Sequence, residues 1–314
     1  MKRNKVLTLT MTAALSLALL LAGCSATTAP AASSAAATTA AETTAADETT
    51  AAATEAASEA PALSGKLEIS GSTSMQELVE KLGEAFMAKN AGVTVNVQGG
   101  GSSVGVQNVI DGLSDIGDAS RALKDEEKAE LTEHVIAQDG VAIIVNPANT
   151  GVTGLTAAQV ADIFSGKVTN WKDVGGKDAD IIVITREASS GTREAFVKLF
   201  GLESTDTAGN TVVNITDKAL ECNDNGSMMT NVSGKEAAIG YCSLGSLNDT
   251  VTALKIDGVE ATAENVKSDT YKYWRPFVMA TKGDGSELAQ AFLDFVYGPD
   301  GQAVVSEKYI PVER

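Results

Sequence analysis

Apolar residues follow strand and helix spacings in turn along residues 64–314. Residues 181–184 form a continuous apolar run of the kind found in buried strands, and the polar loop after them leads into a helix pattern. Four apolar residues of that pattern fall on one stripe: Ala195, Phe196, Leu199 and Phe200. Because strand and helix patterns alternate through most of this region, the sequence predicts an α/β fold with mainly parallel strands.

Loops rich in serine, threonine and glycine separate a strand pattern from a helix pattern at three places. These junctions are residues 70–74, 99–103 and 189–192. A helix start presents unpaired backbone N–H groups and the positive end of the helix dipole, so each junction suits an anion. One junction alone is more often a simple N-cap, but three in one chain favour a shared anion. Arg186 would add a planar cation that matches the oxygens of a tetrahedral oxyanion.

Residues 1–23 have the pattern of an export signal. Lys2, Arg3 and Lys5 precede an apolar run that is short for a membrane span. Cys24 stands at the end of this run, as at a bacterial lipoprotein processing site, so we expect it to carry lipid and to begin the mature chain. The alternative is cleavage further downstream. Residues 24–63 are nearly all Ala, Thr, Ser and Glu, which predicts a disordered tether.

The charge balance argues against nucleic acid as a partner. The chain has 24 Lys and Arg against 41 Asp and Glu, a formal net charge of −17, whereas nucleic-acid affinity comes largely from basic residues on phosphates. An acidic protein can still bind a small anion, because surface charges are screened beyond about 8 Å while N–H groups, hydroxyls and arginine act at contact. We therefore expect binding that depends only weakly on salt.

An extracytoplasmic enzyme, such as a phosphatase or a serine hydrolase that uses Ser74 or Ser190, is a second class of protein to consider. The one histidine, His134, lies outside the loops and suits a solvated position on a charged helix. No cluster with metal-ligand spacing and no nucleophile elbow is present in the sequence. We therefore expect no enzymatic activity, no catalytic residues, no metal and no cofactor. A surface adhesin or sensor is a third class, which the intact Ser-Gly-Thr loop disfavours.

Four ordered motifs resemble those of the phosphate-binding lipoproteins of bacterial phosphate ABC importers. They are residues 69–74, residues 99–103, residues 115–121, and Arg186 with residues 190–192; two later segments, 238–245 and 273–277, are also similar. The resemblance implies a type II periplasmic-binding-protein fold, with two α/β domains joined by a two-segment hinge and the ligand cleft between them. We place domain I at residues 64–146 and 244–314, and domain II at residues 147–243.

Carried over position by position, the resemblance implies a set of phosphate ligands: Thr73, Ser74, Ser102, Arg186, Ser190, Gly191 and Thr192. Ser120 and Arg121, from the third motif, join the predicted site. Arg121 is a departure, because the best-studied branch of the family has there an aspartate that accepts the proton of hydrogen phosphate. We expect Arg121 to be a phosphate ligand rather than a surface arginine.

Selectivity against sulfate depends on a proton acceptor, because a buried carboxylate rejects an anion that has no proton to give. Asp118 is our first candidate for this acceptor, with Glu187 or Glu194 behind it. If none of them serves, sulfate is excluded less well.

The resemblance also implies a role in transport. The protein would be an extracytoplasmic solute-binding lipoprotein, held on the outer face of the cell membrane by lipid on Cys24. It would deliver inorganic phosphate to the permease and ATPase subunits of an ABC importer, and we expect a monomer. The alternative ligands are sulfate and molybdate. Cys222 and Cys242 are either joined by a disulfide or buried as free thiols, and the sequence leaves both open.

Overall fold

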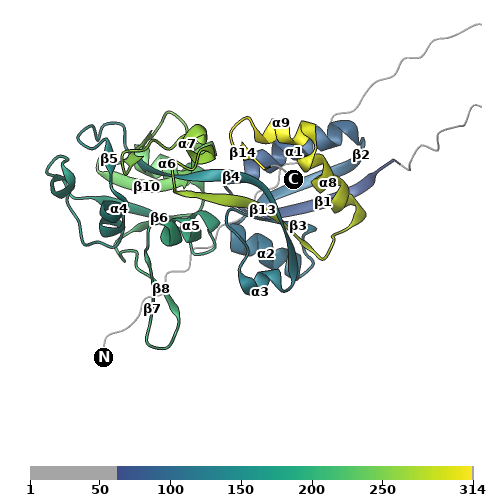
Figure 1. Ribbon diagram of the computed structural model, residues 1–314, viewed down its shortest axis with the longest axis horizontal. Helices are drawn as coiled ribbons and strands as arrows, with labels where there is room; N and C mark the ends of the chain where they lie inside the picture. The colour runs from purple at the N-terminus through teal and green to yellow at the C-terminus, as the bar shows by residue number, and fades with distance from the viewer. Residues whose placement is uncertain (1–61, 313–314) are drawn as a thin grey trace, which may run out of the picture. The chain divides into compact units, whose positions relative to one another are not determined.

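Two lobes, A and B, share the part of the chain that the structure describes (Figure 1). The structure is a computed structural model that describes residues 62–312, within one unit that runs from Ser58 to Arg314. The predicted signal peptide, the lipid on Cys24 and nearly all of the predicted tether lie outside the described residues. None of the described helices has the length and apolar character that crossing a membrane requires.

Lobe A is built around parallel strands, each followed by a polar loop. Strands β1, β2 and β3 pair in parallel, and Ile69 lies opposite both Val97 and Ile116. Strand β13 (Trp274–Lys282) pairs antiparallel to β3 and to β4 (Leu131–Val145). The other elements of lobe A are β1 (Ser64–Gly71), α1 (Gln76–Lys89), β2 (Gly92–Gly99), α2 (Ser102–Ile110), β3 (Ile116–Ala119), α3 (Asp125–Lys128), α8 (Glu287–Tyr297), α9 (Pro299–Val305) and β14 (Ile310–Pro311).

Helices cover both faces of the lobe A sheet. Leu67 and Ile69 of β1 pack on one face with Phe86 of α1 and Phe292 of α8. On the other face, α2 places Val106 in a second apolar cluster with residues of β3 and β13. Burial of these stripes fixes the register of each strand, because a slip by one residue would turn the apolar side chains to the wrong face.

Lobe B repeats this arrangement with a different strand order. Its sheet runs β4, β10, β6 and β9, with β6 parallel to both β10 and β9. Its elements are β5 (Gly154–Leu155), α4 (Ala157–Phe164), the 3₁₀ helix η1 (Trp171–Val174), β6 (Ile182–Arg186), α5 (Gly191–Leu199), β7 (Glu203–Thr205), β8 (Thr211–Val213), β9 (Leu220–Cys222), α6 (Asn225–Ser233), β10 (Ala238–Ser243), the 3₁₀ helix η2 (Leu244–Ser246), β11 (Thr252–Ala253), β12 (Lys255–Ile256) and α7 (Ala263–Lys267).

Two apolar clusters hold lobe B together. Phe164 of α4 and Phe196 of α5 pack with Tyr241 of β10, and the rings of Phe196 and Tyr241 stack at 4.0 Å between centroids. Helix α6 packs Met228 and other apolar residues into a second cluster. The predicted apolar stripe of α5 is therefore part of a core. The start of the same helix lies at the boundary between the lobes.

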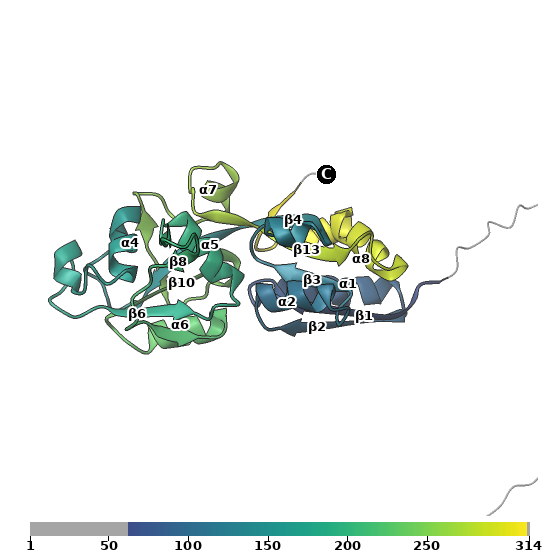
Figure 2. The same cartoon turned by 90° about the horizontal axis from the view of Figure 1, so that it is seen from below.

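Strands β4 and β13 run side by side between the lobes (Figures 1 and 2). The first part of β4 pairs with β13, up to Gly140 opposite Trp274, and its last five residues pair with β10. Strand β4 thus continues without a break to Val145, and the predicted domain boundaries, at residues 146–147 and 243–244, stay predictions. We propose that the crossings lie at Gly140 and Trp274.

Three residues that the sequence left uncertain now have positions. Cys222 and Cys242 are buried free thiols in the apolar cluster under α6, so the structure contains no disulfide between them. His134 lies in β4, where its Nε2 is 3.0 Å from Thr281 Oγ1 of β13. The expectation of a solvated histidine on a helix is wrong, because residues 131–145 form strand β4 and His134 is half-buried in it.

Candidate anion-binding site between the lobes

The carboxyl ends of strands from both lobes meet where the lobes touch. In lobe A, polar loops follow β1, β2 and β3, and in lobe B they follow β6 and β9. This edge of a parallel sheet is where α/β proteins bind ligands. All three of the predicted serine- and glycine-rich junctions lie here, and the contacts between them are direct.

The second and third junctions are joined backbone to backbone. Ser103 N donates to Ser189 O at 3.1 Å, and Ser189 Oγ donates to Gly100 O at 3.3 Å. A Cβ atom on Gly191 would lie only 2.2 Å from Ser102 Oγ. The first turn of α5 therefore approaches lobe A so closely that only glycine fits at position 191.

The first junction reaches the third through Ser74. Its Oγ lies 2.7 Å from Thr192 Oγ1 and accepts a hydrogen bond from Asn225 Nδ2 at 2.9 Å. Asn225 Oδ1 in turn accepts from Ser243 N at 3.3 Å. All four residues are buried, so both hydroxyls are held in place by partners from several elements.

Three further serine hydroxyls line the same region. Ser102 Oγ accepts from Ser120 N at 3.0 Å and lies 3.3 Å from Ser120 Oγ. Ser190 is the N-cap of α5, and its Oγ accepts from Arg193 N at 3.2 Å. Because a hydroxyl has one hydrogen and two lone pairs, Ser190 keeps its hydrogen for a further acceptor.

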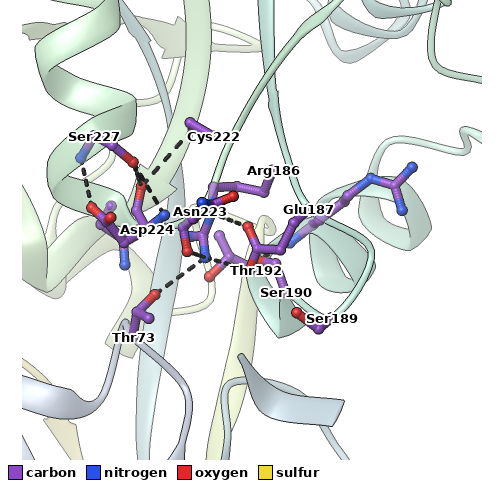
Figure 3. A network of polar contacts seen from close by, with 12 residues as sticks. Thr73, Arg186, Glu187, Ser189, Ser190, Thr192, Cys222, Asn223, Asp224 and Ser227 are labelled. Atoms are coloured by element: carbon purple, nitrogen blue, oxygen red, sulfur yellow. Dashed lines mark hydrogen bonds and ion pairs between the residues drawn. The ribbon is translucent and has the colours of Figure 1, made fainter. Parts of the chain in front are cut away.

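Arg186, the last residue of β6, supplies a buried cation beside these hydroxyls. Its side chain is 1% exposed and forms a two-pronged ion pair with Glu187, with Nε and Nη2 each 2.9 Å from a carboxylate oxygen. Nη2 also donates to Thr73 Oγ1 at 3.2 Å and to Asn223 O at 3.1 Å; Figure 3 shows these contacts. Nη1 is buried and has no hydrogen-bond partner. A buried donor without an acceptor is unfavourable, so this nitrogen is available to the oxygen of a ligand.

Comparisons with known proteins give the same fold. A model of the PBP superfamily domain matches residues 31–300. The phosphate-binding protein PstS of Bacillus subtilis is 38% identical over 261 residues, which are 79% of this chain and 81% of that protein. This chain belongs to the PBP superfamily, in the family of the PstS proteins.

Solved structures extend the match to three dimensions. A Clostridium perfringens phosphate ABC transporter substrate-binding protein with bound phosphate is 41% identical, with a TM-score of 0.74 over 79% of this chain and 100% of that one. A Vibrio cholerae ABC-type phosphate transport receptor is 37% identical, with a TM-score of 0.67 over 79% of this chain and 100% of that one. The predicted fold, two α/β domains of the periplasmic-binding-protein type, is confirmed.

Arg121 lies in the boundary between the lobes but faces carboxylates. Its side chain is 5% exposed, and its Nη1 and Nη2 bind the two oxygens of Glu127 at 2.7 and 2.8 Å. Its Nε lies 2.7 Å from Glu194 Oε2. Arg121 is thus a buried arginine, and our expectation that it is a phosphate ligand rather than a surface arginine stays a prediction. Spacing along the chain could not show the pair with Glu194, because Glu194 belongs to the other lobe.

The predicted proton acceptors have different surroundings. Asp118 is 1% exposed in β3, its Oδ1 has no hydrogen-bond partner, and burial raises the pKa of this carboxyl well above its usual range. Glu187 and Glu194 are each paired with an arginine, which leaves them less free to take a ligand's proton. The acceptor role of Asp118 stays a prediction.

Sequence reasoning missed the loop after β9. Asp224 is the N-cap of α6 and accepts from Ser227 N at 2.6 Å, and the next residue, Asn225, reaches Ser74. The signal was present, because Asn223-Asp224-Asn225 also joins a strand to a helix. Strand β9 has only three residues, too few for its apolar pattern to stand out.

Metal chemistry finds no support within residues 62–312. No group of three or more His, Cys, Asp or Glu side chains in this part of the chain could hold a metal ion. The site instead offers hydroxyls, backbone N–H groups and one buried guanidinium, which together suit an anion rather than a cation.

Proposed function

We propose that this protein binds inorganic phosphate between its lobes and delivers it to the permease of a phosphate ABC transporter. One observation carries the proposal: the buried Nη1 of Arg186 has no partner. Nη2 of the same group donates to Thr73, just before α1, and the start of α5 lies against Ser102 at the start of α2. An oxyanion would give that nitrogen its acceptor. It would also meet the positive ends of three helix dipoles.

The donors around this point suit a tetrahedral anion. Arg186 would bind one oxygen through Nη1, and Thr73, Ser74, Ser102 and Ser120 would reach the ligand from lobe A. From lobe B, Ser190, Gly191 and Thr192 would offer hydroxyls and N–H groups at the start of α5. Because the donors come from both lobes, the bound ligand would hold the lobes together.

The relatives support phosphate as the ligand. The Bacillus subtilis protein is named for phosphate binding, and the Clostridium perfringens structure contains phosphate. Sulfate and molybdate have the same shape and remain the alternative ligands. Discrimination against them would require a proton acceptor, and Asp118 is the candidate that has no ion-pair partner.

The ligand would leave the site chemically unchanged. Ser74 and Ser190, the serines that a hydrolase could use, bind Asn225, Thr192 and a backbone N–H rather than an imidazole. His134, in β4, contacts Thr281 of β13. A general base positioned against a serine, as a hydrolase requires, is therefore missing among these contacts.

The protein would bind phosphate outside the cytoplasm. The apolar run of residues 6–22 and Cys24 support export and a lipid anchor on the outer face of the cell membrane. The partners would be the permease and ATPase subunits of the importer, and the protein would act as a monomer.

The variant Arg186→Gln tests the proposal. It removes the cation and leaves Glu187 facing the anion, so phosphate affinity should fall by at least about a hundredfold. Calorimetric titration measures this loss, and circular dichroism checks that the variant is folded. The control is Lys198→Gln, which removes an exposed cation from the far end of α5 and should bind as the wild type does. A folded Arg186→Gln variant with unchanged affinity would place the ligand elsewhere.

A further inference from the structure

Arg121 follows β3 in lobe A and lies beside the proposed site, but its side chain binds other residues of the protein. Glu127 of α3 binds Nη1 and Nη2, and Nη1 also donates to Ala122 O at 3.0 Å. Nη2 lies 3.4 Å from Ser103 Oγ. The donors on both terminal nitrogens are therefore directed at lobe A itself.

The third nitrogen of the same guanidinium faces lobe B. Nε of Arg121 lies 2.7 Å from Oε2 of Glu194, one turn into α5, in an ion pair that lacks hydrogen-bond geometry. The Glu194 side chain is 30% exposed, whereas that of Arg121 is 5% exposed. Lys124 Nζ, 3.7 Å from Glu194 Oε1, is a weaker and more exposed partner. The Arg121–Glu194 pair is thus a direct ionic contact between the lobes.

Its position couples this contact to the ligand. Glu194 follows Gly191 and Thr192 on α5 by less than one turn. The same first turn of α5 would therefore bind the anion through Gly191 and Thr192, and it binds Arg121 through Glu194. A groove of about 520 Å³ lies beside the pair and is lined by Arg121, Glu194, Trp274 and other residues of both lobes. If α5 moved away from lobe A, Glu194 would enter water while Arg121 kept Glu127.

We propose that Arg121 is a positioning residue, which holds α5 against lobe A through Glu194 and raises affinity for the oxyanion without touching it. The inference rests on the proposed function for its ligand. It replaces the expectation that Arg121 binds phosphate, since all three of its nitrogens already face oxygens of the protein.

Three variants test this role: Arg121→Gln, Glu194→Gln and the double variant. Each single change should weaken phosphate binding by about three- to tenfold. The double variant should bind phosphate no more weakly than the weaker-binding of the two single variants, because both changes remove the same contact. The ratio of phosphate to sulfate affinity should stay as in the wild type. Glu194→Gln leaves the Arg121–Glu127 pair intact, so it tests the contact even if Arg121→Gln folds poorly. Glu126→Gln, an exposed change on α3, is the control.

A second readout needs no ligand. Spin labels at Leu113→Cys in lobe A and Asp173→Cys in lobe B, both exposed positions, report the distance between the lobes. Arg121→Gln and Glu194→Gln should each shift this distribution to longer distances, with or without phosphate. This measurement decides the inference even if the wild type binds no phosphate, which would overturn the proposed function alone.

Two results would overturn the inference. The first is an unchanged distance distribution in folded Glu194→Gln. The second is a loss of binding above about a hundredfold in Arg121→Gln, with an altered phosphate-to-sulfate ratio and no effect of Glu194→Gln, which would make Arg121 a ligand.

Discussion

At the scale of single residues, the site combines satisfied and unsatisfied polar groups. Arg186 is balanced by Glu187 and keeps one nitrogen free, while Asp118 is buried with a free carboxylate oxygen. Unsatisfied groups of this kind are unfavourable in a folded protein and are often associated with function. The two residues nevertheless differ, because Arg186 Nη2 donates to Thr73 Oγ1 at 3.2 Å, whereas Asp118 Oδ1 has no hydrogen-bond partner.

Asp118 should make the protein less stable at neutral pH. Burial raises its pKa in the folded state, so its contribution to stability is greatest below the unfolded value of about 3.9 and is lost as the pH rises toward the folded value. Asp118→Asn should therefore increase the free energy of unfolding at pH 7 by about 1 kcal/mol or more, and by much less near pH 4. Urea unfolding at both pH values measures this, with exposed Asp284→Asn as the control. Equal effects at both pH values would contradict the raised pKa.

At the scale of elements, the start of α5 is the tightest contact between the lobes. Gly191→Ala would place a methyl group 2.2 Å from Ser102 Oγ. We expect phosphate affinity to fall more than about tenfold, because the lobes could no longer approach fully, while the midpoint of urea unfolding changes little.

The control for Gly191→Ala lies at the end of another helix of lobe B. Gly234 ends α6 with φ −79°, and a Cβ there would be 3.2 Å from its nearest neighbour, Thr230 O. Gly234→Ala should leave binding unchanged. Normal phosphate affinity in Gly191→Ala would show that the lobes do not need this contact.

Elements also show how far the sequence could predict this molecule. Apolar spacing located the strand, loop and helix at each of the three junctions, since that pattern is local in the chain. The partners of Arg121 and Ser74 could not be read in this way. Glu194 and Asn225 come from the other lobe, and only the folded topology brings them near. The change of β4 from pairing with β13 to pairing with β10 could not be predicted either, because a strand that serves both lobes has no break in its pattern.

At the scale of the whole molecule, a buried ion pair lies beside the crossing that we propose between the lobes. Arg275 of β13 stands opposite Asp139 of β4, with Nη2 2.9 Å from Oδ2, and the two side chains are 2% and 1% exposed. Burial lowers the pKa of Arg275 and raises that of Asp139, and the attraction between the two charges only partly offsets this. Gly245 N also donates to Asp139 Oδ1 at 3.1 Å.

Breaking this pair should destabilise both lobes. Asp139→Asn leaves the Arg275 charge buried without its partner, so the free energy of unfolding should fall by about 3–5 kcal/mol. Asp178→Asn, which breaks an exposed pair with Lys172 at 3.0 Å, should change it by less than about 1 kcal/mol. Urea unfolding compares the two variants. Equal effects would mean that Asp139 is protonated and that no charged pair stands at the crossing.

The most direct test of the whole account is a calorimetric titration of the wild-type protein with phosphate. The chain without residues 1–24 would first be freed of bound ligand by unfolding and refolding, and sulfate would be titrated next. We predict one phosphate per chain, bound with an affinity that depends little on salt, since the acidic surface gives no long-range attraction. Folded protein that gives no heat with phosphate would contradict the account.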